Sequence, residues 1–204
     1  MKIIFTTIPM KEQIEKLKYP VEGNIDLEYE SPVIFPVNAV LARTLEKGEK
    51  VKVVQLMNDS ASSKKNAEVF RTELRHLNEK INANISFFEV CEAFEENKKT
   101  HEIRFRKLLD YLENDADIIV DMTFGQKTLA IVLFCVLNFA EKFFNAEIKH
   151  IIYGKVEFEN GKIKNNSQCI FDLTPLYYLN TLTSAMEAPD GKSAINVIDK
   201  FFAL

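Results

Sequence analysis

The chain has 204 residues, which suits one compact domain or one domain with a small appendage. Hydrophobic residues make up 47% of it, an ordinary share for a globular core, and the formal net charge is −4. These values exclude a nucleic-acid binder that works by bulk positive charge, so any anion site must be local, built by loops and helix ends.

Metal sites, disulfides and membrane segments are not expected. The three cysteines form an odd set without a CxxC pair, which is typical of free thiols in a reducing cytoplasm. The three histidines lack metal-ligand spacing, so we expect no metal and no cofactor. The first residues do not resemble a signal peptide. The longest apolar run, Leu129–Ala140, is broken only by Asn138 and is shorter than the roughly 20 residues that cross a bilayer. We therefore expect a cytoplasmic protein that does not enter the membrane.

The first half of the chain alternates strands and helices. Lys2–Thr6 is apolar and predicts the central strand of an α/β domain. Residues 19–35 are rich in Pro and Gly and predict a loop that crosses the edge of the protein. Pro36–Lys47 predicts a helix, with proline in its first turn and glycine directly after it. Val51–Met57 predicts the second strand and Lys64–Lys80 the second helix.

The same alternation continues to about residue 153. Ile85–Val90 predicts the third strand, and His101–Leu112 has apolar residues at helical spacing. Asp117–Met122 predicts a buried fourth strand, followed by an apolar helix over Lys127–Asn145 and a fifth strand over Ile148–Tyr153. This order predicts a doubly wound, mainly parallel Rossmann-like sheet with helices on both faces.

The pattern changes in the last quarter of the chain. Asn160 and Gly161 predict a two-residue hairpin turn between Lys155–Phe158 and a short strand at Ile163. Gln168–Asp172 predicts a further strand. Thr174 and Pro175 predict a capped helix start, and Ser193–Phe202 a final short helix.

Ligands of open α/β sheets bind beyond the carboxyl ends of the strands. The four loops to consider there read "TTIPMKE", "NDSASS", "TFGQKT" and "YGKV". From these loops we take as candidate ligand-binding residues Thr6, Thr7, Pro9, Asn58, Ser60, Thr123, Phe124, Gly125, Gln126, Lys127, Thr128, Tyr153 and Gly154.

The third of these loops, which follows the fourth strand, carries the clearest chemistry. Gly125 permits positive φ or close approach to a ligand, and the start of the following helix attracts anions. Lys127 adds a positive charge. The spacing is neither GxxxxGK[ST] nor GxGxxG, which excludes the Walker and dinucleotide signatures. The alternative is a glycine turn with a solvated lysine and a capping threonine. Asp121 could orient Lys127 or cap the turn, and we favour the second.

Structural explanations compete at the other positions too. Thr6 and Thr7 suit a strand end, and Tyr153 suits an aromatic strand end. No Ser-His-Asp order, carboxylate pair or Cys-His pair has persuasive spacing. Charged residues on the predicted helices are expected to be solvated, namely Glu73, Arg75, Arg104 and Arg106.

Three motifs in order resemble the CARF family, the CRISPR-associated Rossmann-fold domains. They are "DMTFGQKT", with Asp121, Thr123, Gly125 and Lys127 in the Asp-x-Thr-x-Gly-x-Arg/Lys pattern, then "YG" at Tyr153, then "DLTP" at Asp172. Phe124, Gln126 and Ile152 depart from the residues frequent in that branch. The resemblance spans roughly residues 1–187, which we expect to form the ligand-binding domain, and 188–204 a helical tail.

The resemblance implies a homodimer that binds a cyclic oligoadenylate, a cyclic tetra- or hexaadenylate, in type III CRISPR antiviral immunity. Lys127 and the helix start would hold phosphate, and Thr6, Thr7 and the second loop would bind ribose or base. The ring could also be cleaved without metal, as in ring nucleases, with Lys127 as electrostatic stabiliser and Thr6 or Thr7 as positioning groups. In that reaction the 2′-OH attacks the adjacent phosphate and leaves a 2′,3′-cyclic phosphate.

Two alternatives remain open. The chain could be a non-catalytic CARF sensor that controls an effector, since no winged-helix segment is evident and it carries no DNA-binding signal. It could instead be a nucleotide-binding module unrelated to CRISPR.

Overall fold

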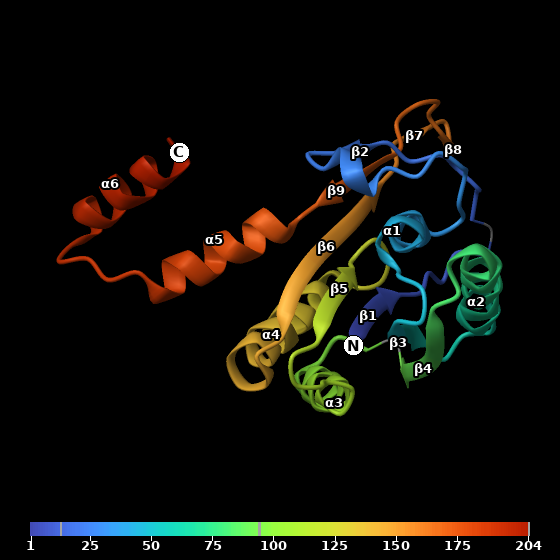
Figure 1. Cartoon of the computed structure of the whole chain (residues 1–204), viewed down its shortest axis with the longest axis horizontal. Helices are drawn as coiled ribbons and strands as arrows, with labels where there is room; N and C mark the ends of the chain where they lie inside the picture. Colours follow the sequence, from blue (N-terminus) through green and yellow to red (C-terminus); the bar gives the residue numbers. More distant parts are fainter. Residues whose placement is uncertain (13, 94, 204) are drawn as a thin grey trace. The chain divides into compact units, whose positions relative to one another are not determined.

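A computed structural model describes residues 1–12, 14–93 and 95–203 (Figure 1). The chain divides into two compact units, Met1–Leu173 and Thr174–Leu204. The boundary that we expected at residue 187 therefore lies within the second unit.

The first unit is an α/β fold around one seven-stranded sheet in the order β2-β9-β6-β5-β1-β3-β4, which confirms the predicted fold class. Its strands are β1 (Lys2–Thr7), β2 (Val21–Glu22), β3 (Lys50–Asn58), β4 (Asn84–Glu92), β5 (Asp117–Asp121), β6 (Glu147–Lys155) and β9 (Cys169–Asp172).

The sheet reverses its winding direction beside β1. The chain runs from β1 outward through β3 to β4, and then returns to β5 and β6 on the other side of β1. These five strands are parallel, whereas β9 is antiparallel to β6. The carboxyl ends of β1 and β5 thus form the switch point, where ligands of such sheets bind.

Four helices cover the two faces of this sheet. They are α1 (Pro36–Thr44), α2 (Ala61–Ile81), α3 (Lys98–Leu109) and α4 (Lys127–Phe144). Helices α1 and α2 pack together on one face, and α3 and α4 pack together on the other (Figure 1). In the part of the chain that the structure describes, no helix is long and apolar enough to cross a membrane.

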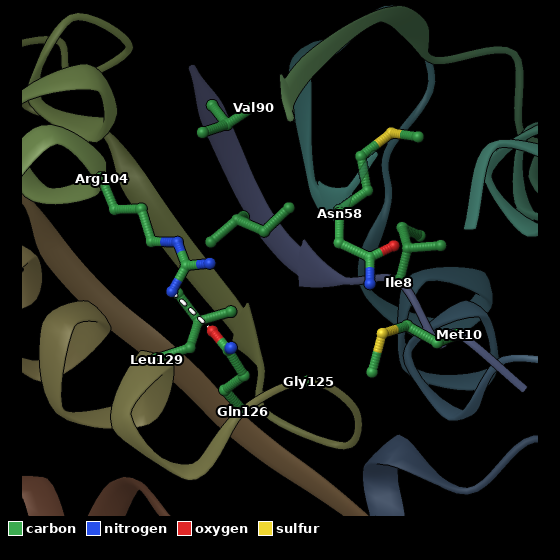
Figure 2. A pocket seen from close by; sticks show the side chains of 10 residues that line it. Ile8, Met10, Asn58, Val90, Arg104, Gly125, Gln126 and Leu129 are labelled. Atoms are coloured by element: carbon green, nitrogen blue, oxygen red, sulfur yellow. Dashed lines mark hydrogen bonds between the residues drawn. The ribbon is translucent and has the colours of Figure 1, made fainter. Parts of the chain in front are cut away.

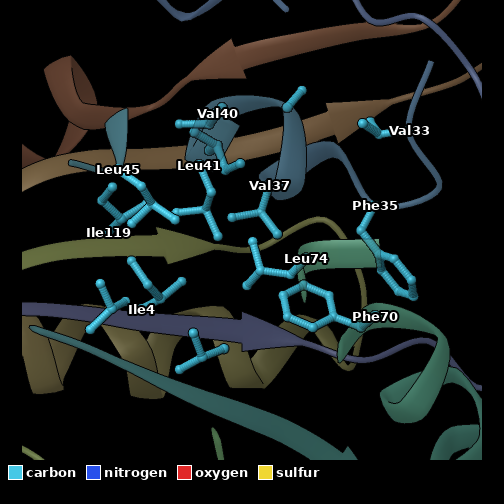
Figure 3. Close-up of a cluster of buried hydrophobic side chains, with 14 of the residues drawn as sticks. Ile4, Val33, Phe35, Val37, Val40, Leu41, Leu45, Phe70, Leu74 and Ile119 are labelled. Atoms are coloured by element: carbon cyan, nitrogen blue, oxygen red, sulfur yellow. The ribbon is translucent and has the colours of Figure 1, made fainter. Parts of the chain in front are cut away.

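The core under α1 and α2 reaches as far as the switch point. Branched side chains of β1, β5 and α1 meet there with Phe70 and Leu74 of α2 (Figure 3). The rings of Phe35 and Phe70 lie edge to face with centroids 5.1 Å apart, and Phe35 meets Phe124 at 6.3 Å. Because Phe124 belongs to the β5–α4 loop, this core anchors one side of that loop.

Two helices of the first unit begin earlier than the sequence predicted, because of their caps. Helix α2 starts at Ala61 rather than Lys64, since the Ser60 hydroxyl accepts a hydrogen bond from the backbone N–H of Ser63 at 3.1 Å. Helix α3 starts at Lys98 and ends at Leu109, since Asn97 Oδ1 accepts from the N–H of Thr100 at 3.0 Å. The polar residues that we assigned to a loop are thus partly helical.

The prediction of a loop at "YGKV" is wrong. Strand β6 continues to Lys155 because its last residues pair with β9, with Tyr153 opposite Phe171 and Gly154 opposite Ile170. Tyr153 and Gly154 therefore belong to a regular ladder.

The segment 19–35 lies along the sheet edge as expected, but it is not wholly irregular. It contains β2, which pairs with β9, and a short 3-10 helix, η1 (Ile25–Leu27). Beyond it in the chain, the predicted hairpin forms from β7 (Phe158–Glu159) and β8 (Lys162–Ile163). Its turn residues have φ of 52° and 78°, the left-handed values that a type I′ turn requires.

The second unit consists of α5 (Thr174–Ala185) and α6 (Gly191–Phe202). The predicted start at Thr174 is confirmed, and α6 begins two residues before Ser193. Asp190 caps α6, because its Oδ1 accepts from the Ser193 N–H at 2.8 Å.

Candidate functional site

The two threonines at the end of β1 hold the end of β5 in place. Thr6 is fully buried and its hydroxyl donates to Asp121 Oδ2 at 2.9 Å. The Thr7 hydroxyl donates to the Asp121 carbonyl at 3.2 Å and accepts from the Phe124 N–H at 3.0 Å. Both groups are used within the protein, so Thr6 and Thr7 position the β5–α4 loop.

Asp121 is the buried anchor of this loop. Its carboxylate has no exposed surface and accepts from the Thr6 hydroxyl and, at 2.9 Å, from the Thr123 N–H. Burial raises its pKa to about 6, against the opposing effect of hydrogen bonds from Thr123 and Thr6. Its side chain has no hydrogen bond with Lys127 among the described residues, which favours the turn-capping interpretation.

Gly125 has the positive φ that its place in the loop suggested. Its φ is +93°, and an added Cβ would lie 3.3 Å from Leu129 Cδ2 and 3.6 Å from Thr7 Cβ. Helix α4 begins directly afterwards at Lys127. The Gln126 side chain does not cap α4, although its carbonyl accepts from the Leu129 N–H at 3.0 Å. The N–H groups of Lys127 and Thr128, which come before Leu129, are left for other acceptors.

A hollow of about 380 Å³ lies beside this loop. It is lined by Thr7, Met122, Thr123, Phe124, Gly125, Gln126, Lys127, Ala130, Leu133, Tyr153 and Leu173. Lys127 is exposed and makes no ion pair with any residue that the structure describes. Tyr153, at 40% exposure, also lines this space. The lining thus combines one cation with apolar and hydroxyl surface.

Gly154 lets strand β6 pack closely against Pro36 at the start of α1. A Cβ at this position would lie 2.4 Å from Pro36 Cγ and 2.8 Å from Pro36 Cβ. Its N–H donates to the Thr123 hydroxyl at 2.8 Å. Strand β6 therefore holds both the start of α1 and the β5–α4 loop, but Gly154 does not line the hollow.

Several other candidate residues also lie outside the hollow. Thr128 donates its hydroxyl to Glu96 at 2.7 Å. Ser60 donates its hydroxyl to Asn58 Oδ1 at 2.7 Å and caps α2. Pro9 is buried, and its carbonyl accepts from the Asn66 amide at 2.9 Å. Thr128 and Ser60, through their hydroxyls, and Pro9, through its backbone carbonyl, are thus part of the supporting structure.

A second, smaller hollow is also lined by Gly125 and Gln126 of this loop (Figure 2). Its polar residues are Asn58, Arg104 and Gln126, and its remaining lining is largely apolar. The prediction that Arg104 is solvated is wrong, because only 7% of the residue is exposed. The signal for this was its spacing: Thr100, Arg104 and Leu108 recur every four residues and form the buried stripe of α3.

The chemistry available at the larger hollow is anion binding. Its lining offers an ammonium group, loop N–H groups and the N-terminus of α4, and it includes no histidine or carboxylate. Among the described residues, no group of three or more His, Cys, Asp or Glu side chains could hold a metal.

Comparisons with known proteins do not identify the chain. No protein-family model matches the sequence, and no curated protein is significantly similar to it.

Proposed function

We propose that this chain binds a cyclic oligoadenylate at the carboxyl edge of its sheet, as a homodimer, in type III CRISPR immunity. The observation that carries the proposal is the hollow of about 380 Å³ at the switch point, with the free cation Lys127 on its rim at the first residue of α4. The order of the motifs "DMTFGQKT", "YG" and "DLTP" supports this ligand class over others.

The loop is suited to phosphate because it is held before any ligand arrives. Its N-terminal end is fixed by the buried contacts among Thr6, Thr7 and Asp121, and its middle by Phe124 against the core. A rigid loop loses little conformational entropy on binding. The helix dipole and Lys127 then act together on one phosphate.

The homodimer follows from symmetry. A cyclic tetra- or hexanucleotide can have a two-fold axis, and a C₂ dimer presents each loop twice around such an axis. Each chain then needs to hold about half of the phosphates. An acidic protein can do this, because the positive potential is confined to the loop.

Lys127 alone does not decide whether the ring is cleaved, because cleavage also needs a group that accepts the proton of the 2′-OH. In cleavage a ribose 2′-oxygen would attack phosphorus and the bond from phosphorus to the 5′-oxygen would break. The 2′-OH proton would pass to solvent water and a proton from solvent would reach the departing 5′-oxygen, giving a 2′,3′-cyclic phosphate and a free 5′-OH. Lys127 would stabilise the charge that develops on the phosphate, and Thr7 would keep the loop in line. No general base lines the hollow in the described part of the chain, which favours a sensor or a slow ring nuclease.

Direct titration tests the proposal. Purified protein is incubated with cyclic tetraadenylate and, separately, cyclic hexaadenylate in EDTA, and binding and products are followed by calorimetry and chromatography. We expect one of the rings to bind, and Lys127→Met to weaken it at least tenfold. Lys142→Met, which changes an exposed lysine of the last turn of α4, is the matched control.

The products separate the two forms of the function. Linear products that disappear in Lys127→Met would establish a ring nuclease, and an intact bound ring would establish a sensor. If neither ring binds at micromolar protein, the proposal fails.

A further inference from the structure

We propose that the smaller hollow, built by Asn58, Arg104 and Gln126, is a second oxyanion subsite that takes a phosphate group (Figure 2). This proposal goes beyond the function proposed above, because the subsite requires only a phosphate group and no particular nucleotide. Where the ligand is an oligonucleotide, the group bound there would be one of its phosphates.

The first argument is the charge of Arg104. The guanidinium is buried, and its hydrogen bonds within the described residues go to neutral acceptors, Gln126 Oε1 at 2.6 Å and the Ala93 carbonyl at 3.1 Å. An arginine has five N–H donors, so much of its capacity remains free. A buried cation that lacks an anionic partner is costly, and a bound oxyanion would compensate it.

The nearest acidic side chains do not supply that partner. Glu92 and Glu96 act on Arg104 at a distance, and burial nevertheless lowers the pKa of Arg104 below its usual value. Glu92 instead binds Lys107, and Glu96 accepts from the Thr128 hydroxyl.

The second argument is that the free polar groups of the hollow are all donors. Gln126 Oε1 is occupied by Arg104, while its Nε2 is buried and has no hydrogen-bond partner among the described residues. Asn58 Oδ1 accepts from the N–H and hydroxyl of Ser60, which leaves the amide NH₂ of Asn58. Two amide donors and a guanidinium fork around one space favour a ligand that only accepts, as a phosphate does.

The size and the lining of the hollow further restrict the class of ligand that it can hold. Its volume of about 40 Å³ holds roughly three waters, which suits a small oxyanion better than a nucleobase. The walls are apolar and include Ile8, Leu56 and Leu129. Apolar walls lower the local dielectric and strengthen the pairing of a phosphate with Arg104.

Phosphate titration with matched variants tests the subsite. Inorganic phosphate, adenosine 5′-monophosphate and adenosine are titrated into the whole chain and followed by calorimetry. We expect inorganic phosphate to bind the wild-type protein, and Arg104→Met to weaken it at least tenfold. Arg106→Met, an exposed arginine on the same helix, should leave binding unchanged.

A second variant covers the case in which Arg104→Met does not fold. Asn58→Asp keeps an oxygen to accept from Ser60 but places negative charge in the hollow. It should also weaken phosphate at least tenfold, with an unchanged urea midpoint. If adenosine 5′-monophosphate binds more tightly than inorganic phosphate, the phosphate bound in this hollow belongs to a nucleotide. If the two bind equally, the ligand is the free anion.

The outcomes distinguish this proposal from the proposed function. The comparison of Arg104→Met with Arg106→Met uses inorganic phosphate and does not involve Lys127, so its result stands even if no cyclic oligoadenylate binds any variant. If wild-type protein binds no phosphate at millimolar concentration, or if Arg104→Met and Asn58→Asp bind it like wild type, the subsite does not exist. Binding of the cyclic ring could then still stand.

Discussion

At the scale of single residues, Asp121 combines a structural role with a stability cost. Its pKa is raised to about 6 by burial, whereas the unfolded chain has an ordinary carboxyl pKa near 3.8. The folded state therefore holds the Asp121 proton more tightly than the unfolded chain does. The stabilisation that this proton gives to the folded state is fully present below about pH 4 and is lost as the pH rises through 6. A shift of about two units corresponds to about 3 kcal/mol.

The substitution Asp121→Asn tests this sign. Asparagine can keep hydrogen bonds to Thr6 and Thr123 but does not titrate. We expect the free energy of unfolding of wild-type protein, relative to that of Asp121→Asn, to fall between pH 4 and pH 6.5. Urea titrations of both proteins across that range measure it. Parallel curves would show that Asp121 ionises normally in the folded chain.

Gly154 gives a prediction that depends on space alone. In Gly154→Ala the new methyl would meet Pro36 at 2.4 Å, so strand β6 or helix α1 must move. Overpacking of this kind typically costs about 1–3 kcal/mol. Urea unfolding of the variant measures the loss.

The matched control for Gly154→Ala is Gly191→Ala. No atom lies within 4 Å of a Cβ at Gly191, and its φ is not positive, so we expect little change. If both variants unfold at the wild-type midpoint, the close approach of β6 and α1 is not maintained in solution.

The sequence correctly predicted the positive φ of Gly125 and the start of α4 at Lys127, because glycine and a helix start are local signals. The burial of Arg104 was not predicted from the sequence, because only the charge of the residue was considered and this placed it on the surface. A charged side chain in the buried stripe of a helix contradicts its own pattern, and such conflicts are typical of functional positions.

At the scale of elements, Glu73 shows why the start of some helices cannot be predicted from the neighbouring sequence. Helix α1 has no side-chain cap from its own N-cap residue, Phe35. The carboxylate of Glu73 in α2 accepts instead from the N–H groups of Ile34 and Phe35 at 2.7 and 3.1 Å and from the Asn38 amide at 2.9 Å. The sequence-based prediction of a solvated Glu73 is therefore wrong, since its partners lie 35 or more residues away.

Removing this carboxylate should destabilise the protein. Glu73→Ala leaves two backbone N–H groups and an amide without acceptors, and we expect a loss of about 3 kcal/mol. Glu73→Gln, which keeps one acceptor oxygen, should lose less. Chemical unfolding compares both with Glu79→Ala, an exposed residue of the same helix. Equal stability of Glu73→Ala and Glu79→Ala would contradict this role.

At the scale of the whole molecule, periodicity predicted the parallel strands and their helices but not the edge of the sheet. Apolar runs identify buried strands such as β1 and β5, because both of their faces are covered. Strand β2 has two residues and exists only because β9 pairs with it, so it left no periodic signal in the sequence. The continuation of β6 past Tyr153 depends on the same distant pairing.

The stoichiometry of ligand binding tests the proposed symmetric site at this scale. Among the described residues, Lys127 is the one lysine that lines the larger hollow, so a cyclic ring held on a two-fold axis between two such hollows should bind once per two chains. Calorimetry should then give half a ring per chain, and sedimentation should show a dimer that carries one ring. Inorganic phosphate at the Arg104 hollow should bind once per chain, because that hollow is complete within one chain. One ring bound per chain to a monomer would remove the two-fold site and leave a nucleotide-binding module.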